Sequence, residues 1–364
     1  MVISHPDPAL SPDLGEDLLK LVDRLPDLKH GKWIRRALEV LVRMSGEEID
    51  RLDWKILTHA LEDMERGFQS FYPYRHTRKI TIFGSARISE GSSEYRFAVE
   101  FARRIADLGF MVLTGAGGGI MQAGNEGAGR ENSFGLNIQL PFEQGANPYI
   151  IDDPKLISFK YFFTRKLFFL RESDAIALFP GGFGTQDEAF ETLTLCQTGK
   201  YGPAPLVLID EPGGDYWQTW QERICANLQK RGLISPEDVY LYTITNDLTL
   251  ACDAIRNFYR VYHSSRFVGE SFVMRLNHDI TDTQLEQIND MFSDIVVTGK
   301  IERSKPLSEE TNGQEELREI ARTGHLPRLV FHFNQQSYGR LYQLIHLINS
   351  FGLVSTEEEH PERK

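Results

Sequence analysis

Apolar and polar positions follow different periods in different parts of the chain. Over residues 16–25, 33–44 and 47–71, apolar residues recur at spacings of three and four. This period is that of amphipathic helices, so we expect the first part of the chain to be helical. The sequence YPYRHTRK interrupts the pattern. We therefore predict a helical N-terminal region over residues 1–74.

Short apolar runs then alternate with helical patterns from residue 75 to residue 264. The runs KITIF, FMVLTG, FGLNIQL, AIALF, PLVLI and VYLYTI have the length and composition of buried parallel strands. Helical periodicity lies between them, over residues 93–108, 120–130, 185–196, 216–230 and 248–262. The alternation predicts an α/β fold, a Rossmann-like doubly wound parallel sheet whose ligands bind beyond the carboxyl ends of the strands.

The pattern changes again after Ser265. ESFVMRLN, a helical stretch, IVVTGKIE, a polar stretch, LPRLVFHFN and a last helical stretch follow one another. The order predicts a small α+β domain over residues 265–364, ferredoxin-like or ACT-like in arrangement. Such a domain serves oligomerisation, packing or ligand sensing, and the sequence leaves these roles open.

Composition narrows the classes of partner. The formal net charge of −12 disfavours binding to nucleic acid through phosphate neutralisation, although a local basic pocket for a small anion remains compatible with it. The three cysteines show neither a CxxC pair nor metal-ligand spacing, which fits a reducing compartment. Neither a signal-peptide pattern nor an apolar run of membrane-spanning length is present, so we expect a cytoplasmic protein that does not bind membranes.

Three glycine-rich turns follow strand-like runs in the central region. Glycines at such junctions let backbone N–H groups approach an anion, and the amino terminus of the next helix adds favourable partial charge. The alternative is that each glycine only permits a tight turn, but three turns at the same edge of one sheet favour a phosphate-containing ligand. The candidate residues are Gly84, Ser85 and Arg87 in IFGSAR, Gly117, Gly118 and Gly119 in TGAGGG, and Gly181, Gly182, Gly184 and Thr185 in PGGFGT.

Two common nucleotide-binding patterns are absent. The run GAGGGI has isoleucine at position 120, where the GxGxxG fingerprint of dinucleotide-binding folds needs glycine or alanine. The chain also lacks the GxxxxGK[ST] sequence of P-loop proteins. A mononucleotide or a sugar phosphate therefore fits the glycine turns better than a dinucleotide or ATP hydrolysis does.

Arg165 lies in unusually apolar surroundings. On a helix over residues 158–172, both faces carry mostly aromatic and aliphatic side chains, which is typical of a buried helix. A buried guanidinium needs a partner because an unpaired charge is costly to bury. Arg165 therefore either forms a structural ion pair, for example with Asp174, or points into a cavity.

Glu188 also has two interpretations. The sequence Thr185-Gln-Asp-Glu188 has the spacing of a capping box, in which Thr185 caps the helix and Glu188 bonds back to its backbone. The cap leaves unexplained the PGGFG run before it and the neighbouring acids Asp187 and Glu191. The second interpretation is a carboxylate that faces the ligand.

A known family carries a similar set of residues. PGGFGTQDE resembles the PGGxGTxxE signature of the LOG (Lonely Guy) phosphoribohydrolases, which are often mislabelled lysine decarboxylases. IFGSAR, TGAGGGIMQAGNEGA and TRKLFFLRESDAIALF resemble other elements of that family, so the resemblance covers roughly Ile80 to Tyr262. The helical first part and the last hundred or so residues lie outside it.

The resemblance implies an activity. The family cleaves the N-glycosidic bond of nucleoside 5′-monophosphates, including AMP-like nucleotides and cytokinin ribotides, to free base and ribose 5-phosphate. By position in the motifs, Arg165 and Glu188 match the catalytic residues of the family. The PGGFGT backbone and Thr185 match its phosphate-binding turn, and Lys166 is expected to contact the substrate. The resemblance also implies a homodimer or higher homo-oligomer, with no metal or cofactor, and no lysine here has a recognisable pyridoxal phosphate context.

Departures from the family pattern leave an alternative. ISEGSSEY follows the first glycine turn, and Ile120-Met121-Gln122 stands where the family often has GLMG. These changes put the preferred base in question. The alternative function is a non-catalytic module that binds a nucleotide and senses it through the last domain.

Overall fold

The computed structural model describes residues 13–140, 145–311 and 320–352. The chain divides into two compact units, Met1–Leu61 and Glu62–Lys364. The first unit contains α1 (Leu14–Arg24), α2 (Gly31–Ser45) and the beginning of α3 (Arg51–Phe71). Asp13 caps α1 by accepting a hydrogen bond from Glu16 N at 3.0 Å. The helical periods of the N-terminal sequence therefore form helices.

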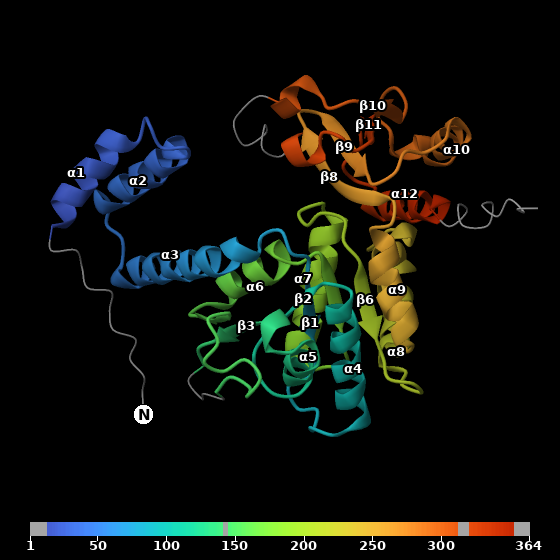
Figure 1. Ribbon diagram of the computed structural model, residues 1–364, viewed down its shortest axis with the longest axis horizontal. Helices are drawn as coiled ribbons and strands as arrows, with labels where there is room; N and C mark the ends of the chain where they lie inside the picture. The colour runs from blue at the N-terminus through green and yellow to red at the C-terminus, as the bar shows by residue number, and fades with distance from the viewer. Residues whose placement is uncertain (1–12, 141–144, 312–319, 353–364) are drawn as a thin grey trace, which may run out of the picture. The chain divides into compact units, whose positions relative to one another are not determined.

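A seven-stranded parallel sheet is the centre of the second unit (Figure 1). The strands lie in the order β4-β3-β2-β1-β5-β6-β7, and every neighbouring pair is parallel. This is the predicted Rossmann-like α/β fold. The strands are β1 (Lys79–Phe83), β2 (Met111–Thr114), β3 (Ser133–Ile138), β4 (Leu156–Phe159), β5 (Ala175–Leu178), β6 (Leu206–Ile209) and β7 (Thr243–Thr245).

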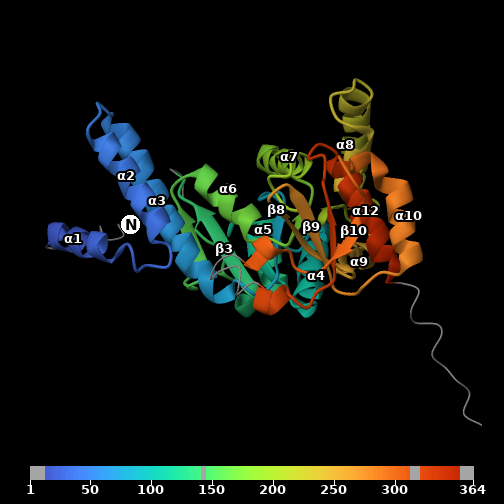
Figure 2. The same cartoon turned by 90° about the horizontal axis from the view of Figure 1, so that it is seen from above.

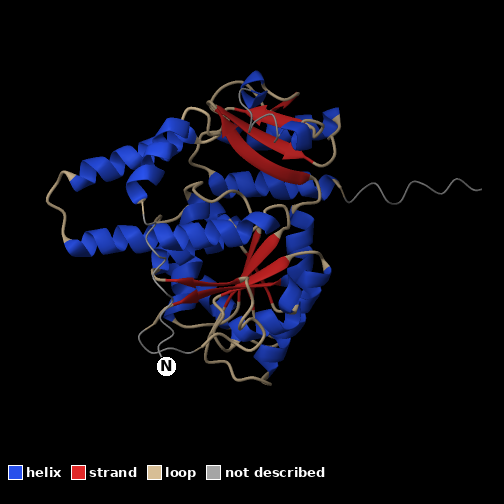
Figure 3. Ribbon diagram, turned by 60° about the vertical axis from the view of Figure 1, so that its left-hand side comes forward, coloured by secondary structure: helices blue, strands red, loops and turns tan. Residues whose placement is uncertain are grey.

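Helices cover both faces of this sheet, as Figure 3 shows. Alternate residues of β1 explain why: Ile80 and Ile82 enter a core shared with α4, α5 and α9, whereas Phe83 enters a core shared with α6, α7 and α8. The helices are α4 (Ser93–Asp107), α5 (Ile120–Ala128), α6 (Phe162–Arg171), α7 (Phe183–Gln197), α8 (Tyr216–Ile224) and α9 (Leu248–Phe258), with short turns η1 (Tyr72–Tyr74), η2 (Arg130–Asn132), η3 (Cys225–Gln229) and η4 (Pro236–Leu241).

The helix that carries Arg165 is shorter than the sequence predicts. Ser158 and Phe159 end strand β4, and α6 begins only at Phe162. The burial pattern also differs, because Phe163 and Leu167 are exposed whereas Phe168 and Phe169 are buried. The apolar spacing of the helix continues by chance into the last residues of β4. The predicted helix therefore starts too early.

A buried carboxylate from α3 fixes the beginning of α6. Asp63 is fully buried and accepts hydrogen bonds from Lys160 N (3.0 Å), Tyr161 N (3.2 Å) and Thr164 Oγ1 (2.6 Å). Arg66 on the same helix adds an ion pair at 2.5 Å. Asp63 therefore satisfies amide groups at the amino end of α6, although it lies about a hundred residues away in sequence.

The C-terminal part forms a four-stranded antiparallel sheet in the order β10-β11-β9-β8. Two strands precede its first helix, whereas the ferredoxin-like chain order has one. The ferredoxin-like or ACT-like arrangement stays a prediction. The segment IVVTGKIE, expected as a strand, contributes only its last residue, Glu302, to β10, and Val296 forms an isolated bridge with Phe333. The elements are β8 (Tyr262–Val268), β9 (Ser271–Leu276), α10 (Asp282–Phe292), η5 (Ser293–Ile295), β10 (Glu302–Ser304), η6 (Ser308–Thr311), β11 (Arg328–Phe331) and α12 (Tyr338–Phe351).

Helix α12 packs in the core of the antiparallel sheet, which also includes Cys196 of α7 and Phe258 of α9. Figure 2 shows α12 beside α10, and α12 also contacts α9 and α7. Asn349 on α12 accepts hydrogen bonds from Val261 N (2.8 Å) and Tyr262 N (3.0 Å), and it donates to Phe258 O (2.7 Å). The chain between α9 and β8 is thus bonded to α12. The residue-265 boundary and separate roles for the three predicted regions stay predictions.

We expect Asp63→Ala to destabilise the protein by roughly 2–4 kcal/mol, because buried amide donors at the start of α6 lose their acceptor. Urea unfolding followed by circular dichroism measures the effect. Glu65→Ala, an exposed acid on the same helix, is the matched control and should change stability little. Equal losses in the two variants would contradict the role of Asp63.

Candidate functional site

The three glycine turns meet at the carboxyl edge of the parallel sheet. Ser85 N donates to Pro180 O at 3.0 Å, which joins the turn after β1 to the turn after β5. Ile120 N donates to Ser85 O at 3.0 Å, which joins the turn after β1 to the start of α5. The first turn is therefore the central one, and the three predicted turns form one site.

Close packing explains two of the glycines in these turns. A Cβ atom on Gly119 would overlap Ser85 O, and the residue has a φ of +62°, which favours glycine. A Cβ atom on Gly181 would overlap Thr185 Oγ1 and lie 3.0 Å from Ser85 N. By contrast, no heavy atom lies within 4 Å of a Cβ built on Gly182 or Gly184. The backbone at these two residues faces open space.

Buried polar side chains hold the second turn. Ala116 has a φ of 62°, a strained value for a residue with a side chain. Thr114 Oγ1 accepts from Ala116 N at 3.1 Å, and Asn147 N donates to Ala116 O at 2.8 Å. Asn147 Nδ2 also donates to Gly117 O at 3.1 Å and to Asn125 Oδ1 at 2.9 Å. The sequence offered no signal for Asn147 because it lies in an irregular segment.

Tyr216 supports the third turn. Its hydroxyl donates to Gly181 O at 2.5 Å and accepts from Gln186 Nε2 at 2.6 Å. Tyr216 begins α8, the helix after β6, so the neighbouring strand of the sheet also contributes to this turn. Sequence reasoning missed this residue, because a tyrosine at a helix start carries no functional pattern.

Arg165 points from α6 toward the second glycine turn. Its Nη1 atom lies 3.8 Å from a Cβ built on Gly115, and its guanidinium carbon lies 5.0 Å from the Phe162 ring and 5.5 Å from the Phe169 ring. Burial lowers the pKa of Arg165, while the charge of Glu188 opposes the shift. Among the described residues, the Nε atom has no hydrogen-bond partner.

The proposed ion pair between Arg165 and Asp174 does not form. Asp174 Oδ2 instead accepts from Lys79 N at 2.9 Å, at the amino end of β1. Asp174 is thus excluded as the partner of Arg165, whose guanidinium lies beside Gly115 of the second glycine turn. Its contact with a ligand stays a prediction. The prediction of a mostly buried arginine is met, but its apolar contacts come from Phe162 and Phe169.

Glu188 is buried in the first half of α7, with 6% of its surface exposed. Burial raises its pKa to about 7, although nearby Lys166 and Arg165 lower it and Glu191 and Asp187 raise it further. In the described part of the chain, its Oε2 atom has no hydrogen-bond partner. The carboxyl group therefore titrates near neutrality and keeps one oxygen available.

The predicted capping box is wrong. Helix α7 begins at Phe183 with Gly182 as its cap residue, and no side chain caps it. Thr185 consequently lies within the first turn, and Glu188 lies too far along the helix to bond back to the cap. The extended backbone of Gly182, with φ −85° and ψ −155°, starts the helix earlier than the Thr-x-x-Glu spacing indicated.

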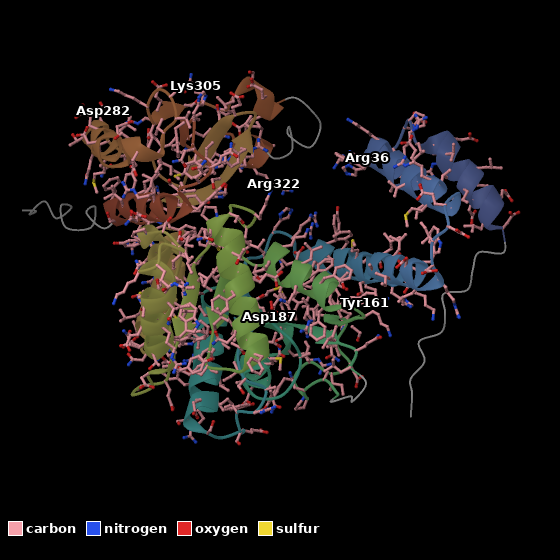
Figure 4. All side chains as sticks on the ribbon, turned by 180° about the vertical axis from the view of Figure 1, so that it is seen from behind. Arg36, Tyr161, Asp187, Asp282, Lys305 and Arg322 are labelled. Carbon is pink, nitrogen blue, oxygen red and sulfur yellow. The ribbon has the colours of Figure 1, made fainter. Side chains whose placement is uncertain are left out.

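Lys166 joins the two acids that flank Glu188. Its Nζ atom lies 2.8 Å from Asp187 Oδ2 and 2.5 Å from Glu191 Oε2. Figure 4 shows the labelled Asp187 on α7. The ammonium group is thus shared between two carboxylates, while its charge also acts on Glu188. Its predicted contact with substrate stays a prediction.

The remaining predicted residues lie around the first turn. Arg87 N donates to Ser85 Oγ at 3.1 Å, and the Arg87 side chain is exposed. Gly84 packs against Ile120, where a Cβ would approach to 2.6 Å. A Cβ built on Gly118 would lie 3.7 Å from Ala86 O. The predicted glycines thus lie in the three turns that meet, and the Arg87 side chain is exposed beside them. Their contact with a ligand stays a prediction.

Two other kinds of feature, a metal site and a membrane-spanning helix, are absent from the described residues. No group of three or more histidine, cysteine, aspartate or glutamate side chains is arranged to hold a metal ion in residues 13–140, 145–311 and 320–352. Within the same ranges, no helix has the length and apolar character needed to cross a membrane.

Comparison with known proteins identifies the central domain. Residues 118–255 match the family model described as "Possible lysine decarboxylase". This segment is therefore a domain of that family, the LOG-family domain. No curated protein matches the chain.

Solved structures resemble about half of the chain. The X-ray structure of TM1055 is 23% identical over 49% of this chain and 98% of that chain, with a TM-score of 0.36. The molybdenum cofactor carrier protein of Chlamydomonas reinhardtii is 19% identical over 50% and 97%, with a TM-score of 0.35. The molybdenum cofactor binding protein of Rippkaea orientalis is 17% identical over 50% and 96%, also with a TM-score of 0.35.

The raised pKa of Glu188 predicts a pH-dependent stability. The folded state favours the protonated carboxyl. The stability that the protonated form confers on the folded state is therefore fully present below pH 4.5, the ordinary pKa of the carboxyl in the unfolded chain, and is lost as the pH rises through about 7. Glu188→Gln stays neutral and avoids that loss. We expect the variant to gain up to roughly 3 kcal/mol relative to the wild type between pH 4 and pH 8, at about 1.4 kcal/mol per pKa unit.

Urea unfolding of both proteins at pH 4 and pH 8 measures this gain. Glu222→Gln, which changes an exposed acid on α8, is the control and should show no such gain. A stability difference between Glu188→Gln and the wild type that is the same at both pH values would contradict the buried, proton-retaining carboxyl.

Proposed function

We propose that the protein hydrolyses the N-glycosidic bond of nucleoside 5′-monophosphates and releases a free base and ribose 5-phosphate. The observation that carries the proposal is the buried Glu188, which has a pKa of about 7 and one unbonded carboxyl oxygen in the described chain. It lies near Arg165 at the edge where three glycine turns meet. The LOG-family domain supports the same class of reaction.

The glycine turns support binding of the 5′-phosphate. Gly182 and Gly184 have open space beside their backbone, and they stand at the amino end of the fifteen-residue helix α7. Free N–H groups at a helix start attract a phosphate by hydrogen bonding and by the helix dipole. Ser85 and Arg87 lie on the adjacent turn and add a hydroxyl group and a positive charge. A phosphate held there brings the sugar near Glu188.

The proposed reaction uses water as the nucleophile. The bond between the anomeric carbon of ribose and the base nitrogen breaks, and its electron pair leaves with the base. Positive charge develops on the sugar, as in other glycoside hydrolyses, and the ionised Glu188 stabilises it. Water adds to the anomeric carbon and loses a proton to Glu188; the departing base takes up a proton from solvent, and Glu188 releases its proton to solvent and returns to the carboxylate. The products are the free base and ribose 5-phosphate.

Arg165 has a different role in the proposal. A guanidinium group stays protonated in proteins, so Arg165 donates hydrogen bonds and does not act as a base. Its position between Phe162 and Phe169 leaves few alternative orientations for the guanidinium. We assign it to the orientation of Glu188 and to contact with a sugar or phosphate oxygen.

We also propose that the protein acts as a homo-oligomer. Apolar side chains are exposed beside the candidate site on α6 and at the start of α7, and Phe183 in the third turn is 95% exposed. Exposed apolar side chains grouped in this way are typical of protein interfaces. A second copy that covers Phe162, Phe163 and Phe183 would shield the site from water.

A substrate panel tests the reaction. We expect at least one of AMP, GMP, CMP, UMP and a cytokinin ribotide to give free base and ribose 5-phosphate, measured by product chromatography. Glu188→Gln should lower kcat by roughly 10²–10⁴-fold, because the variant cannot stabilise the positive charge or accept a proton. Thr194→Ala, an exposed change on the same helix, should keep the wild-type rate.

Two results would refute the reaction. One is the absence of base release from every nucleotide in the panel, and the other is full activity in Glu188→Gln. Binding of a nucleotide by calorimetry without turnover would instead favour the alternative, a non-catalytic module that senses a nucleotide.

The pH dependence tests the state of Glu188 separately. Since the ionised carboxylate is the active form and its pKa is about 7, we expect kcat/KM to rise about tenfold per pH unit below pH 7 and to level off above it. Initial rates from pH 5 to pH 9 measure the profile. A profile that is flat down to pH 5 would show that the active carboxyl has an ordinary pKa and would contradict this assignment.

A further inference from the structure

A second group of basic side chains lies at the opposite edge of the parallel sheet. The segment RHTRK, residues 75–79, leads into β1, whose other end is the first glycine turn. At ~3.3 Å per residue, the five residues of β1 separate the two edges by about 17 Å. This basic group is therefore distinct from the candidate functional site.

The helical turn that precedes β11 contributes one basic residue to the same place. Arg322 Nη1 contacts His76 Nδ1 at 3.2 Å, although the two residues are 246 positions apart. A guanidinium group has no acceptor, so Arg322 donates and His76 accepts with an unprotonated Nδ1. Figure 4 shows Arg322 on the side of the antiparallel sheet that faces the parallel sheet. We call Arg75, His76, Arg78 and Arg322 the basic junction.

The guanidinium groups of the basic junction are held in place without carboxylate partners. Arg78 stacks on the Tyr259 ring, with its guanidinium carbon 3.8 Å from the ring centre, and Arg75 stacks on Tyr72 at 4.0 Å. Within residues 13–140, 145–311 and 320–352, none of Arg75, Arg78 and Arg322 forms a salt bridge to a carboxylate. Stacking orders an arginine and leaves its N–H groups available to a ligand.

The pKa values of two histidines show how closely the cations approach one another. Burial, followed by Arg78, Arg275 and His325, lowers the pKa of His263 on β8. Partial desolvation and then Arg322, Arg75 and Lys79 lower the pKa of His76. The two histidines therefore respond to arginines from the segment before β1 and from the C-terminal part of the chain.

Few acids oppose these charges. Asp174 accepts from the backbone of Lys79, and its charge also acts on Arg78. Glu172 forms an ion pair with Arg171 and lies 3.9 Å from Lys79 Nζ. Among the residues that the structure describes, two carboxylates thus face five cations, which are Arg75, Arg78, Lys79, Arg171 and Arg322. The basic junction keeps a local positive charge in a chain whose net charge is −12.

We propose that the basic junction is a second binding site, for a small molecule that carries two or more phosphate groups. Guanidinium groups bind phosphate oxygens through paired N–H donors, and several of them fit an oligophosphate better than a single carboxylate. A nucleic-acid chain is a poorer fit, because the net charge of −12 disfavours binding of an extended polyanion. The site does not depend on the reaction proposed for Glu188.

Calorimetric titration of the full-length protein with tripolyphosphate tests the proposal. We expect saturable binding that weakens at least tenfold in Arg322→Glu, since one attractive charge becomes a repulsive one. Arg322 is exposed, so the substitution leaves the cores intact. Arg231→Glu reverses the charge of another exposed arginine and should bind as the wild type does. Arg78→Lys, which keeps the charge and loses the paired donors, should weaken binding less than Arg322→Glu.

The glycine turns also attract phosphate, so a variant of that site completes the test. Ser85→Glu places a carboxylate among the turns and should leave tripolyphosphate binding unchanged. Loss of binding in Ser85→Glu but not in Arg322→Glu would overturn the proposal, as would the absence of binding to the wild type. Parallel titrations with pyrophosphate, ADP and ATP identify the source of the phosphates. If ADP or ATP binds more tightly than tripolyphosphate and loses its binding in Arg322→Glu, the ligand is a nucleoside polyphosphate.

Discussion

The reversal of strand order between β1 and β5 is the constraint on which the candidate site depends. Strands β2, β3 and β4 extend the sheet on one side of β1, and β5, β6 and β7 extend it on the other. The chain therefore leaves β1 toward α4 on one face and leaves β5 toward α7 on the opposite face. Diverging connections open a crevice at the carboxyl ends of these strands. The hydrogen bond from Ser85 N to Pro180 O joins the turns after β1 and β5 at this edge, and Glu188 lies on α7, the helix that follows the second of these turns.

The buried carboxyl of Glu188 opposes stability when it is ionised. Desolvation alone would keep Glu188 protonated, whereas Lys166 and Arg165 bring its pKa back to about 7. Each cation is fixed by other parts of the fold: α6 carries both and starts at a cap supplied by Asp63, and Asp187 and Glu191 hold the Lys166 ammonium group. The titration of one carboxyl thus reflects side chains from α3, α6 and α7.

The sequence predicted the parts of the site that depend on local patterns and missed those that depend on distant contacts. Glycine turns after apolar runs were sufficient to locate the edge of the sheet, because parallel strands bring their carboxyl ends together. Arg165 and Glu188 stood out by their surroundings and by the family resemblance. The cap supplied by Asp63 joins residues 97 and more positions apart, and Asn147 and Tyr216 act from irregular or ordinary positions. The start of α6 was misplaced because periodicity does not separate a short buried strand from a following helix.

The distribution of charge connects the two sites. In a chain with a net charge of −12, cationic side chains lie near both ends of β1. Screening limits the reach of such groups to about 10 Å at moderate salt, so neither site acts on the other through charge alone. Influence between them requires movement of β1 or of the helices packed on it. Ile80 and Ile82 are fully buried between the layers, so β1 shifts only together with its neighbours. A shift of this rigid strand therefore moves the residues at both of its ends.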